Sequence, residues 1–193
     1  LTAIDDAPAC LFVRGETEAL LSAQLAMVGS RTPTAGGRRD AHEFARHFAC
    51  GGLVITSGLA LGIDAASHEG ALSCGRTIAV LGTGLDACYP PENRDLAERL
   101  VAAGGALVSE SPPGTVPHKG NFPRRNRLIS GLALGTLVVE AARQSGSLIT
   151  ARLAGTQGRD VFAIPGSIHS PQSHGCHDLI RQGARLVESA LEV

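Results

Sequence analysis

The sequence predicts an α/β domain in which a mostly parallel, doubly wound sheet carries helices on both faces. Short runs of Val, Ile and Leu recur without the polar alternation of a half-exposed strand, which indicates strands buried on both faces. Each run is followed by a Gly-marked turn and a segment of helical period, and strands that alternate with helices build parallel sheets. The expected fold is therefore of the extended Rossmann-like type, in which ligands collect beyond the carboxyl ends of the strands.

The apolar runs give the expected strands, and the periodic segments between them give the expected helices. We expect strands at 25–28, 53–55, 78–81, 106–108, 137–139 and 161–164, with a further short strand at 185–187. Helices are expected near 37–50, 62–73, 92–103, 146–157 and 175–182. Phe44 and Phe48 lie four residues apart, which places both on one helix face as core residues.

Length and composition favour one globular domain. The chain has 193 residues, of which 44% are hydrophobic and 18% charged, and its polar residues interrupt every stretch long enough to span a membrane. We therefore expect residues 1–193 to form a single domain. The first residue is Leu1 and the one methionine is Met27, so we expect this domain to be a piece of a longer protein.

The five cysteines are scattered, and no two of them form a CxxC pair. They are Cys10, Cys50, Cys74, Cys88 and Cys176. This usage favours reduced thiols in a cytoplasmic protein over disulfides or a zinc site. Three histidines, His169, His174 and His177, lie near Cys176 in a loop rich in Pro, Gly and Ser, but their spacing fits no zinc pattern. We expect neither a metal nor a cofactor.

The segment HKGNFPRRNRLIS, residues 118–130, carries four basic residues in a chain whose formal net charge is −1. The whole interval between Glu110 and Glu140 lacks Asp and Glu. Such a segment is suited to contact with phosphates, because Lys and Arg gain most by neutralising a polyanion. The alternative is a solvated loop whose charges pair with carboxylates elsewhere in the fold.

Three expected strand exits are rich in Gly and Ser. They supply Gly29, Ser30, Arg31, Ser57, Gly58, Ser145, Gly146 and Ser147. Small residues let backbone N–H groups approach an anion, and the N-terminus of a following helix adds partial positive charge. For the first exit, VGSRTPTAGGRR at 28–39, a tight turn with Pro at the helix start is the alternative, although it does not account for Arg31.

Two further motifs have simpler interpretations. Asp64 and His68 share one expected helix face, so we expect a hydrogen bond between them and place Asp64 at the helix cap or the cleft. GTGLDA at 82–87 matches the dinucleotide fingerprint as text, but that fingerprint requires a helix to begin there, and Pro90 and Pro91 follow instead. The context predicts no nicotinamide or flavin site.

Seven segments occur in a fixed order along the chain. They are VGSR, SGLALGID, TIAVLGTGLDACYPPEN, SESPPGTVPHKGNFPRRNRLISGL, VVEAARQSGSLITARLA, GRDVFAIPG and GCHDLIRQGA. Together, from about Pro8 to Val187, they resemble the DNA-processing protein A (DprA/Smf) family. The resemblance implies an extended Rossmann fold that binds single-stranded DNA, shields it from nucleases and helps to load the RecA recombinase, chiefly during natural transformation. It also implies a cytoplasmic homodimer that is not an enzyme, with further small domains in many members.

By this resemblance Arg31 and Lys119 hold DNA, and Phe122 offers one aromatic face to a base. Leu61 departs from the family, since relatives often have a basic residue there. The candidate DNA-binding residues are Gly29, Ser30, Arg31, Ser57, Gly58, Lys119, Asn121, Phe122, Arg124, Arg125, Asn126, Arg127, Ser145, Gly146 and Ser147. If all four charges of residues 118–130 met phosphates, the slope of log affinity for single-stranded DNA against log salt concentration would be roughly −3.

Two other function classes remain open. The first is a nucleoside monophosphate phosphoribohydrolase. Such enzymes have a Rossmann-like nucleotide site, and the segments RNR and SGSLIT of this chain distantly resemble its layout. Hydrolysis there needs a carboxylate on the helix after the turn, but none occurs between Glu140 and Asp160, and we expect Glu140 to organise the loop as a hydrogen-bond acceptor. The second is a Rossmann-like protein that binds a small nucleotide without catalysis.

Overall fold

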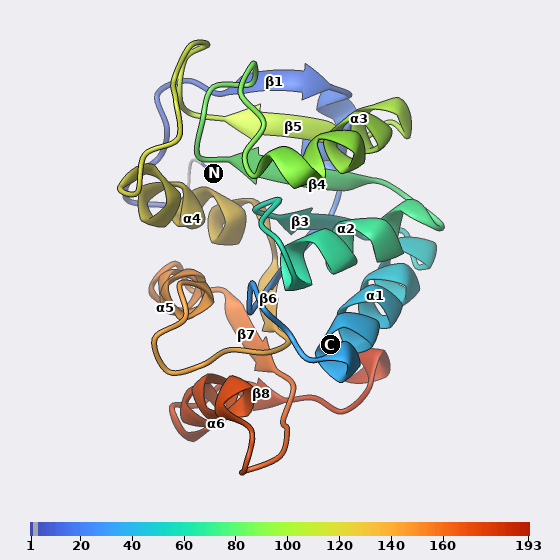
Figure 1. Ribbon diagram of the computed structural model, residues 1–193, viewed down its shortest axis with the longest axis vertical. Helices are drawn as coiled ribbons and strands as arrows, with labels where there is room; N and C mark the ends of the chain where they lie inside the picture. Colours follow the sequence, from blue (N-terminus) through green and yellow to red (C-terminus); the bar gives the residue numbers. More distant parts are fainter. Residues whose placement is uncertain (2–3) are drawn as a thin grey trace.

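The computed structural model describes Leu1 and residues 4–193, which build one eight-stranded sheet with helices on both faces (Figure 1). The strands are β1 (Phe12–Gly15), β2 (Gln24–Val28), β3 (Val54–Ser57), β4 (Thr77–Leu81), β5 (Ala106–Ser109), β6 (Gly135–Val138), β7 (Asp160–Ala163) and β8 (Arg185–Leu186). Their order across the sheet is β1-β5-β4-β3-β2-β6-β7-β8, and every neighbouring pair is parallel except β1 with β5. The predicted fold class is confirmed.

Six α-helices form the outer layers. They are α1 (Ala35–Cys50), α2 (Ile63–Leu72), α3 (Arg94–Ala102), α4 (Asn121–Leu132), α5 (Ser147–Thr156) and α6 (His174–Arg181). Figure 1 shows α1, α2 and α3 on one side of the sheet and α4, α5 and α6 on the other. Helices on both faces bury the inner strands β2 to β6 completely, which is why these strands consist mainly of apolar residues.

The core has a separate part on each face, because neighbouring residues of a strand point to opposite sides. On β2, Leu25 and Met27 pack with Phe48 of α1 and Ile63 of α2. Alternating with them, Ala26 and Val28 belong to the cluster that contains Leu128 of α4 and Leu148 of α5. Phe44 and Phe48 lie with ring centroids 6.0 Å apart, so the predicted shared helix face is confirmed.

One strand and one α-helix of the described residues, β1 and α4, were not predicted. β1 is a short antiparallel edge strand whose residues are only partly buried or exposed, so its sequence lacks a long apolar run. α4 contains the basic segment, where no helix was expected. Pro123 is tolerated because it lies in the first turn of the helix. Arg125 and Arg127, at 7% and 5% exposure, occupy core-facing positions where an apolar residue would have revealed the helical period.

The predicted hydrogen bond between Asp64 and His68 is wrong. The Asp64 carboxylate accepts the amides of Gly58 and Ala60 at 3.1 and 3.3 Å. His68 Nδ1 lies 2.6 Å from Thr77 Oγ1. Complete burial lowers the pKa of His68 to about 3, so its ring is neutral and belongs to the core beneath β4.

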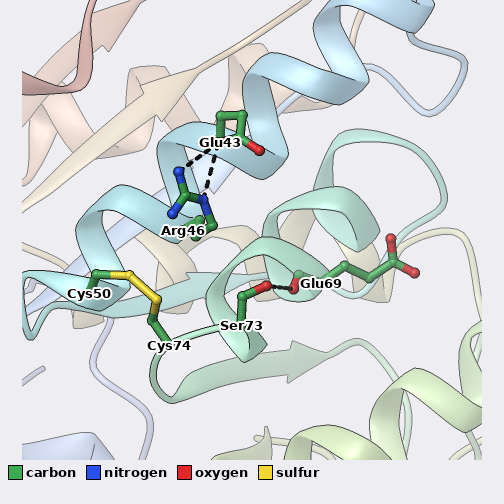
Figure 2. The surroundings of a disulfide bond; sticks show 6 residues. All are labelled: Glu43, Arg46, Cys50, Glu69, Ser73 and Cys74. Carbon is green, nitrogen blue, oxygen red and sulfur yellow. Dashed lines mark hydrogen bonds and ion pairs between the residues drawn. A yellow bond between two sulfur atoms is a disulfide. The ribbon is translucent and has the colours of Figure 1, made fainter.

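The expectation of reduced thiols is also wrong for one pair of cysteines. Cys50 ends α1 and Cys74 follows α2, and a disulfide joins them with a Cα–Cα distance of 5.0 Å (Figure 2). The two cysteines lie 24 residues apart in sequence, and the packing of α1 against α2 brings them together. The spacing of the two cysteines in sequence could not predict the disulfide, because their proximity depends on the packing of these two helices. Cys10, Cys88 and Cys176 are free.

Breaking this disulfide should lower the free energy of unfolding by roughly 3 kcal/mol. The bond closes a loop of 24 residues, and without it the unfolded chain gains conformational entropy. Urea unfolding of Cys50→Ser under non-reducing conditions measures the loss, and Cys10→Ser, at an exposed free thiol, is the matched control. Equal stability of the unsubstituted chain with and without reductant would contradict the expectation.

Within the described part of the chain, every helix is too short or too polar to cross a bilayer.

Candidate nucleic-acid interface

A cavity of about 690 Å³ lies at the carboxyl edge of the sheet. Its lining residues come from the turn after β2 and from the segments that follow β3, β4, β5, β6 and β7. β2 and β6 are neighbours in the sheet, and later strands are added outward from them in both directions, β3 to β5 on one side and β7 to β8 on the other. This topological switch point is where open α/β sheets bind ligands. We call this cavity the switch-point cleft.

The turn after β2 brings backbone close to the centre of the cleft. A Cβ atom on Gly29 would lie 2.7 Å from Ile63 Cγ1 and 2.8 Å from the Glu140 carbonyl, so only glycine fits. Ser30 Oγ accepts the amide of Thr32 at 3.1 Å. The amides of Ser30 and Arg31 donate to no acceptor among Leu1 and residues 4–193, while the Arg31 side chain is exposed. The turn therefore offers unpaired N–H donors and a cation to the same space.

Glu140 fixes this turn from the neighbouring strand. Its carboxylate accepts the amide of Thr34 at 2.9 Å and the Thr34 hydroxyl at 2.6 Å. Thr34 Oγ1 in turn accepts the amide of Gly37 at 3.0 Å and caps α1. A Cβ on Gly37 would come within 2.3 Å of Glu140 Cδ, which explains the glycine. The predicted role of Glu140 as a loop-organising acceptor is confirmed.

The mouth of α5 forms the opposite side of the cleft. Ser145 Oγ and Ser147 Oγ lie 2.7 Å apart, and Ser145 Oγ also accepts the amide of Ser147 at 3.3 Å. The amide of Gly146 donates to no acceptor in the described residues. Asn126 Nδ2 of α4 donates to the Gly146 carbonyl at 3.4 Å, which ties the two helices together.

The start of α4 supplies a cation and an aromatic ring. Lys119 is exposed and lines the cleft, and Phe122 is half-buried beside it. Arg31 Cζ lies 5.9 Å from the centroid of the Phe122 ring, within the range of a cation–π contact. A Cβ on Gly82 would lie 2.8 Å from Phe122 Cδ1, so the loop after β4 supports this ring.

Arg125 lies deeper, at the floor of the cleft. Its guanidinium donates to the carbonyl of Gly58 at 3.0 Å and to that of Val80. Burial, and to a lesser extent the nearby Arg31, lowers the pKa of Arg125 to about 10, so it remains protonated at neutral pH. Burial raises the pKa of Asp64, an effect that Arg125 and two backbone amides oppose. Arg125 therefore adds positive charge while it joins the loop after β3 to strand β4.

Arg127 and Arg124 fit the alternative interpretation of paired charges. Arg127 is buried, with Nε 2.8 Å from an Asp6 carboxylate oxygen and Nη2 2.6 Å from Glu110 Oε1. Arg124 Nε lies 3.6 Å from Glu110 Oε2 at the surface. Arg127 cannot reach a phosphate without breaking these pairs. The four charges of the basic segment are therefore not all free to meet phosphates.

Most of the predicted candidates meet in the switch-point cleft. Those that line it are Gly29, Ser30, Arg31, Lys119, Phe122, Arg125, Asn126, Ser145, Gly146 and Ser147. The remaining five are Ser57, Gly58, Asn121, Arg124 and Arg127. Ser57 is fully buried and donates to the Met27 carbonyl at 2.6 Å. The amide of Gly58 donates to Asp64, and its carbonyl accepts from Arg125. Asn121 and Arg124 line an adjacent cavity of about 140 Å³ that shares Arg125 with the cleft.

Several lining residues were not predicted, including Thr32, Tyr89, Gln144 and Gln172. Thr32 directly follows the predicted Arg31, and Gln144 directly precedes the predicted Ser145, so the lining of the cleft extends one residue further along each loop. Gln172 reaches the cleft from the loop after β7, where its Nε2 donates to the Thr32 carbonyl at 3.2 Å. Tyr89 had a signal that was not used: it is the one tyrosine of a chain with few aromatic residues.

The GTGLDA segment lies in the loop after β4, and the next helical residues begin at Pro91, as the context predicted. The residues of the His/Cys loop have separate partners. Cys176 is buried, and its Sγ lies 3.8 Å from the Val138 carbonyl oxygen. Burial raises the pKa of this thiol to about 12. His174 and His177 each contact a backbone carbonyl, of Ile168 and Gly166 respectively, at 3.0 Å.

Comparison with known proteins gives consistent matches over the whole chain. The family model described as DNA recombination-mediator protein A matches residues 1–193. Protein Smf of Escherichia coli is 54% identical over all of the chain, which spans only 52% of that relative. The X-ray structure of DNA processing protein A from Streptococcus pneumoniae has a TM-score of 0.93 at 47% identity and covers 100% of this chain and 68% of that one. The structure of DNA processing protein A from Helicobacter pylori has a TM-score of 0.90 at 32% identity. The match covers 98% of this chain and 87% of that one. The chain thus covers about half the length of its Escherichia coli relative.

Proposed function

The chain belongs to the DNA recombination-mediator protein A family, and from this membership we propose that it binds single-stranded DNA in the switch-point cleft. The Helicobacter pylori relative is described by its single-stranded DNA binding mode, which supports the proposal. In this proposal the chain acts by binding and presenting a strand, and it carries out no bond chemistry.

One observation carries the proposal most strongly: cations and unpaired amide donors converge on one cavity. Arg31, Lys119 and Arg125 line it, and the free amides of Ser30 and Gly146 lie at its two sides. Positive charge with N–H donors is the combination that binds phosphate oxygens. Both kinds of contact read the backbone of the strand rather than base edges, so we expect binding without sequence preference.

The half-buried ring of Phe122 favours a single strand over a duplex. An aromatic side chain gains about 1–3 kcal/mol by stacking on a base, and any base offers such a face. Bases in a duplex are already stacked on their neighbours and present only their edges in the grooves. The same cations therefore give weaker and more salt-dependent binding to double-stranded DNA.

The wider activities are proposals as well, since the chain covers only about half the length of its Escherichia coli relative. We propose that strand binding shields DNA from nucleases and helps to load RecA during DNA uptake, and that two copies act together in the cytoplasm. Two linked sites raise the effective affinity for one strand without new contacts. This matters because each cleft has few cations and one predicted stacking ring.

A nucleotide hydrolase or a mononucleotide sensor is the alternative. Among the described residues that line the cleft, Asp64 is the one carboxylate, and it is buried and accepts two backbone amides. A general base must reach the water that it activates, and this carboxylate is already committed to the loop. Free base released from nucleoside monophosphates, or competition of mononucleotides with an oligonucleotide at equal concentration, would favour the alternative.

The experiment that tests the proposal is a titration of labelled oligo-dT and of a duplex of equal length at several salt concentrations. We expect the single strand to bind more tightly. With Arg31 and Lys119 as the exposed cations of the cleft, the slope of log affinity against log salt should be about −1.4, whereas four phosphate contacts would give roughly −3. Equal affinity for both forms, or a slope near zero, would contradict the proposal.

A further inference from the structure

Tyr89 lies on the rim of the switch-point cleft, beside Phe122. The residue is 42% exposed, and the two ring centroids lie 5.5 Å apart with the ring planes tilted by 37°. This separation is typical of an interacting aromatic pair. Tyr89 comes from the loop after β4, while Phe122 comes from α4, so the pair is assembled from two elements by the fold.

The environment of this pair is that of a binding surface. Arg31 Cζ lies 5.9 Å from the Phe122 centroid, and Lys119 lines the same cavity. A tyrosine that served only to support Phe122 would be covered by its neighbours, as Gly82 already covers one edge of that ring. Exposed aromatic rings next to cations are the recurring elements of surfaces that hold single strands, since rings take the bases and cations take the phosphates.

We propose that Tyr89 forms a second base-stacking position next to Phe122, so that the cleft holds two neighbouring bases of one strand. This inference rests on the proposed function and extends it, because a single stacking ring was expected from the sequence. The tilt between the rings means that the two bases lie in different planes, so the strand turns where it crosses the rim. The ligand class is an unpaired strand of any base sequence, because stacking uses the face that every base has.

A base fits between Arg31 and Phe122 only after a small shift of Arg31. A base between a guanidinium and a ring needs about 7 Å, twice the ~3.5 Å of a carbon contact. Arg31 and Phe122 are separated by 5.9 Å. Because Arg31 is exposed, a small movement of its side chain toward a phosphate opens the space, while Tyr89 is already accessible.

The composition of the chain allows a direct test. Tyr89 is the one tyrosine, and the chain has no tryptophan, so intrinsic emission reports on this ring alone. We expect oligo-dT to quench the emission as it saturates the cleft. An abasic oligomer of equal length keeps the phosphates but has no bases, and it should bind more weakly and leave the emission of the bound protein unchanged.

Substitutions give an independent measurement. Tyr89→Leu should weaken binding of labelled oligo-dT about tenfold, the loss of one stacked base, whereas Tyr89→Phe should bind within about twofold of the unsubstituted chain. Leu134→Ala, at an exposed apolar residue before β6 and outside the cleft, is the matched control. Thermal unfolding of each variant verifies that the fold is retained.

The outcomes separate this inference from the proposed function. If oligo-dT binds by anisotropy but neither quenches the tyrosine nor distinguishes Tyr89→Leu from the unsubstituted chain, the second stacking position is wrong and the cleft still binds DNA. If the abasic oligomer quenches as strongly as oligo-dT, the emission change is not due to stacking, and the inference is also wrong. If oligo-dT does not bind at all, both are overturned.

Discussion

Arg31→Glu and Lys119→Glu should each weaken binding of oligo-dT by roughly thirtyfold or more, with the fold intact. Both side chains are exposed, both line the switch-point cleft, and neither has a carboxylate partner within the described residues. A charge-assisted phosphate contact is worth about 2 kcal/mol, and the new carboxylate adds repulsion. Fluorescence anisotropy at low and moderate salt measures the loss, which should shrink as salt screens the charges.

Arg76→Glu is the matched control for these reversals. Arg76 is exposed and immediately precedes β4, so it lies at the amino edge of the parallel strands, opposite to the cleft. The same change of net charge at that position should alter affinity by no more than about twofold. If Arg76→Glu weakened binding as much as Arg31→Glu, overall charge and not the cleft would explain the binding. Unchanged affinity in both cleft variants would contradict the site assignment.

Arg125→Ala should lower the free energy of unfolding by about 3 kcal/mol and the melting temperature by about 10 °C. The side chain is 7% exposed, and its loss would leave the carbonyls of Gly58 and Val80 without their donor and Asp64 without a nearby cation. This effect distinguishes Arg125 from Arg31, whose substitution affects binding alone. Differential scanning calorimetry measures both quantities.

Arg124→Ala is the control for this experiment, because Arg124 is the neighbouring residue on the same helix but is exposed. Its one ion pair, with Glu110 at 3.6 Å, lies at the surface, where such pairs contribute about 1 kcal/mol or less. A melting temperature of Arg125→Ala equal to that of Arg124→Ala would show that the buried guanidinium does not stabilise the joining of α4 to β4 and to the loop after β3.

The fold was predictable from sequence because both faces of the parallel strands are covered. Burial on both faces produces apolar runs such as Ile78–Leu81 that cannot be confused with a half-exposed strand. β1 was missed for the same reason in reverse: it is an edge strand, and its residues need not be apolar. α4 was missed because Arg125 and Arg127 stand on its buried face, and the energy of those positions comes from long-range partners that no local pattern contains.

The candidate site was predictable in its location but not in the role of each residue. The glycines and hydroxyls at 29–31 and 145–147 marked the exits of β2 and β6 correctly, because the carboxyl edge of a parallel sheet collects such turns. The basic segment could not be divided into free and paired charges from sequence alone. That division depends on Asp6 and Glu110, which lie far from Arg127 along the chain and meet it only in the fold.

The central claim is that the sugar-phosphate chain of a single strand lies against the exits of β2 and β6. A crystal structure of the chain with a short thymidine oligomer tests this most directly. We expect phosphate oxygens within hydrogen-bond distance of the amides of Ser30, Arg31 or Gly146, with Lys119 beside the same strand. An oligomer bound only at another surface, with the switch-point cleft holding water, would contradict the account.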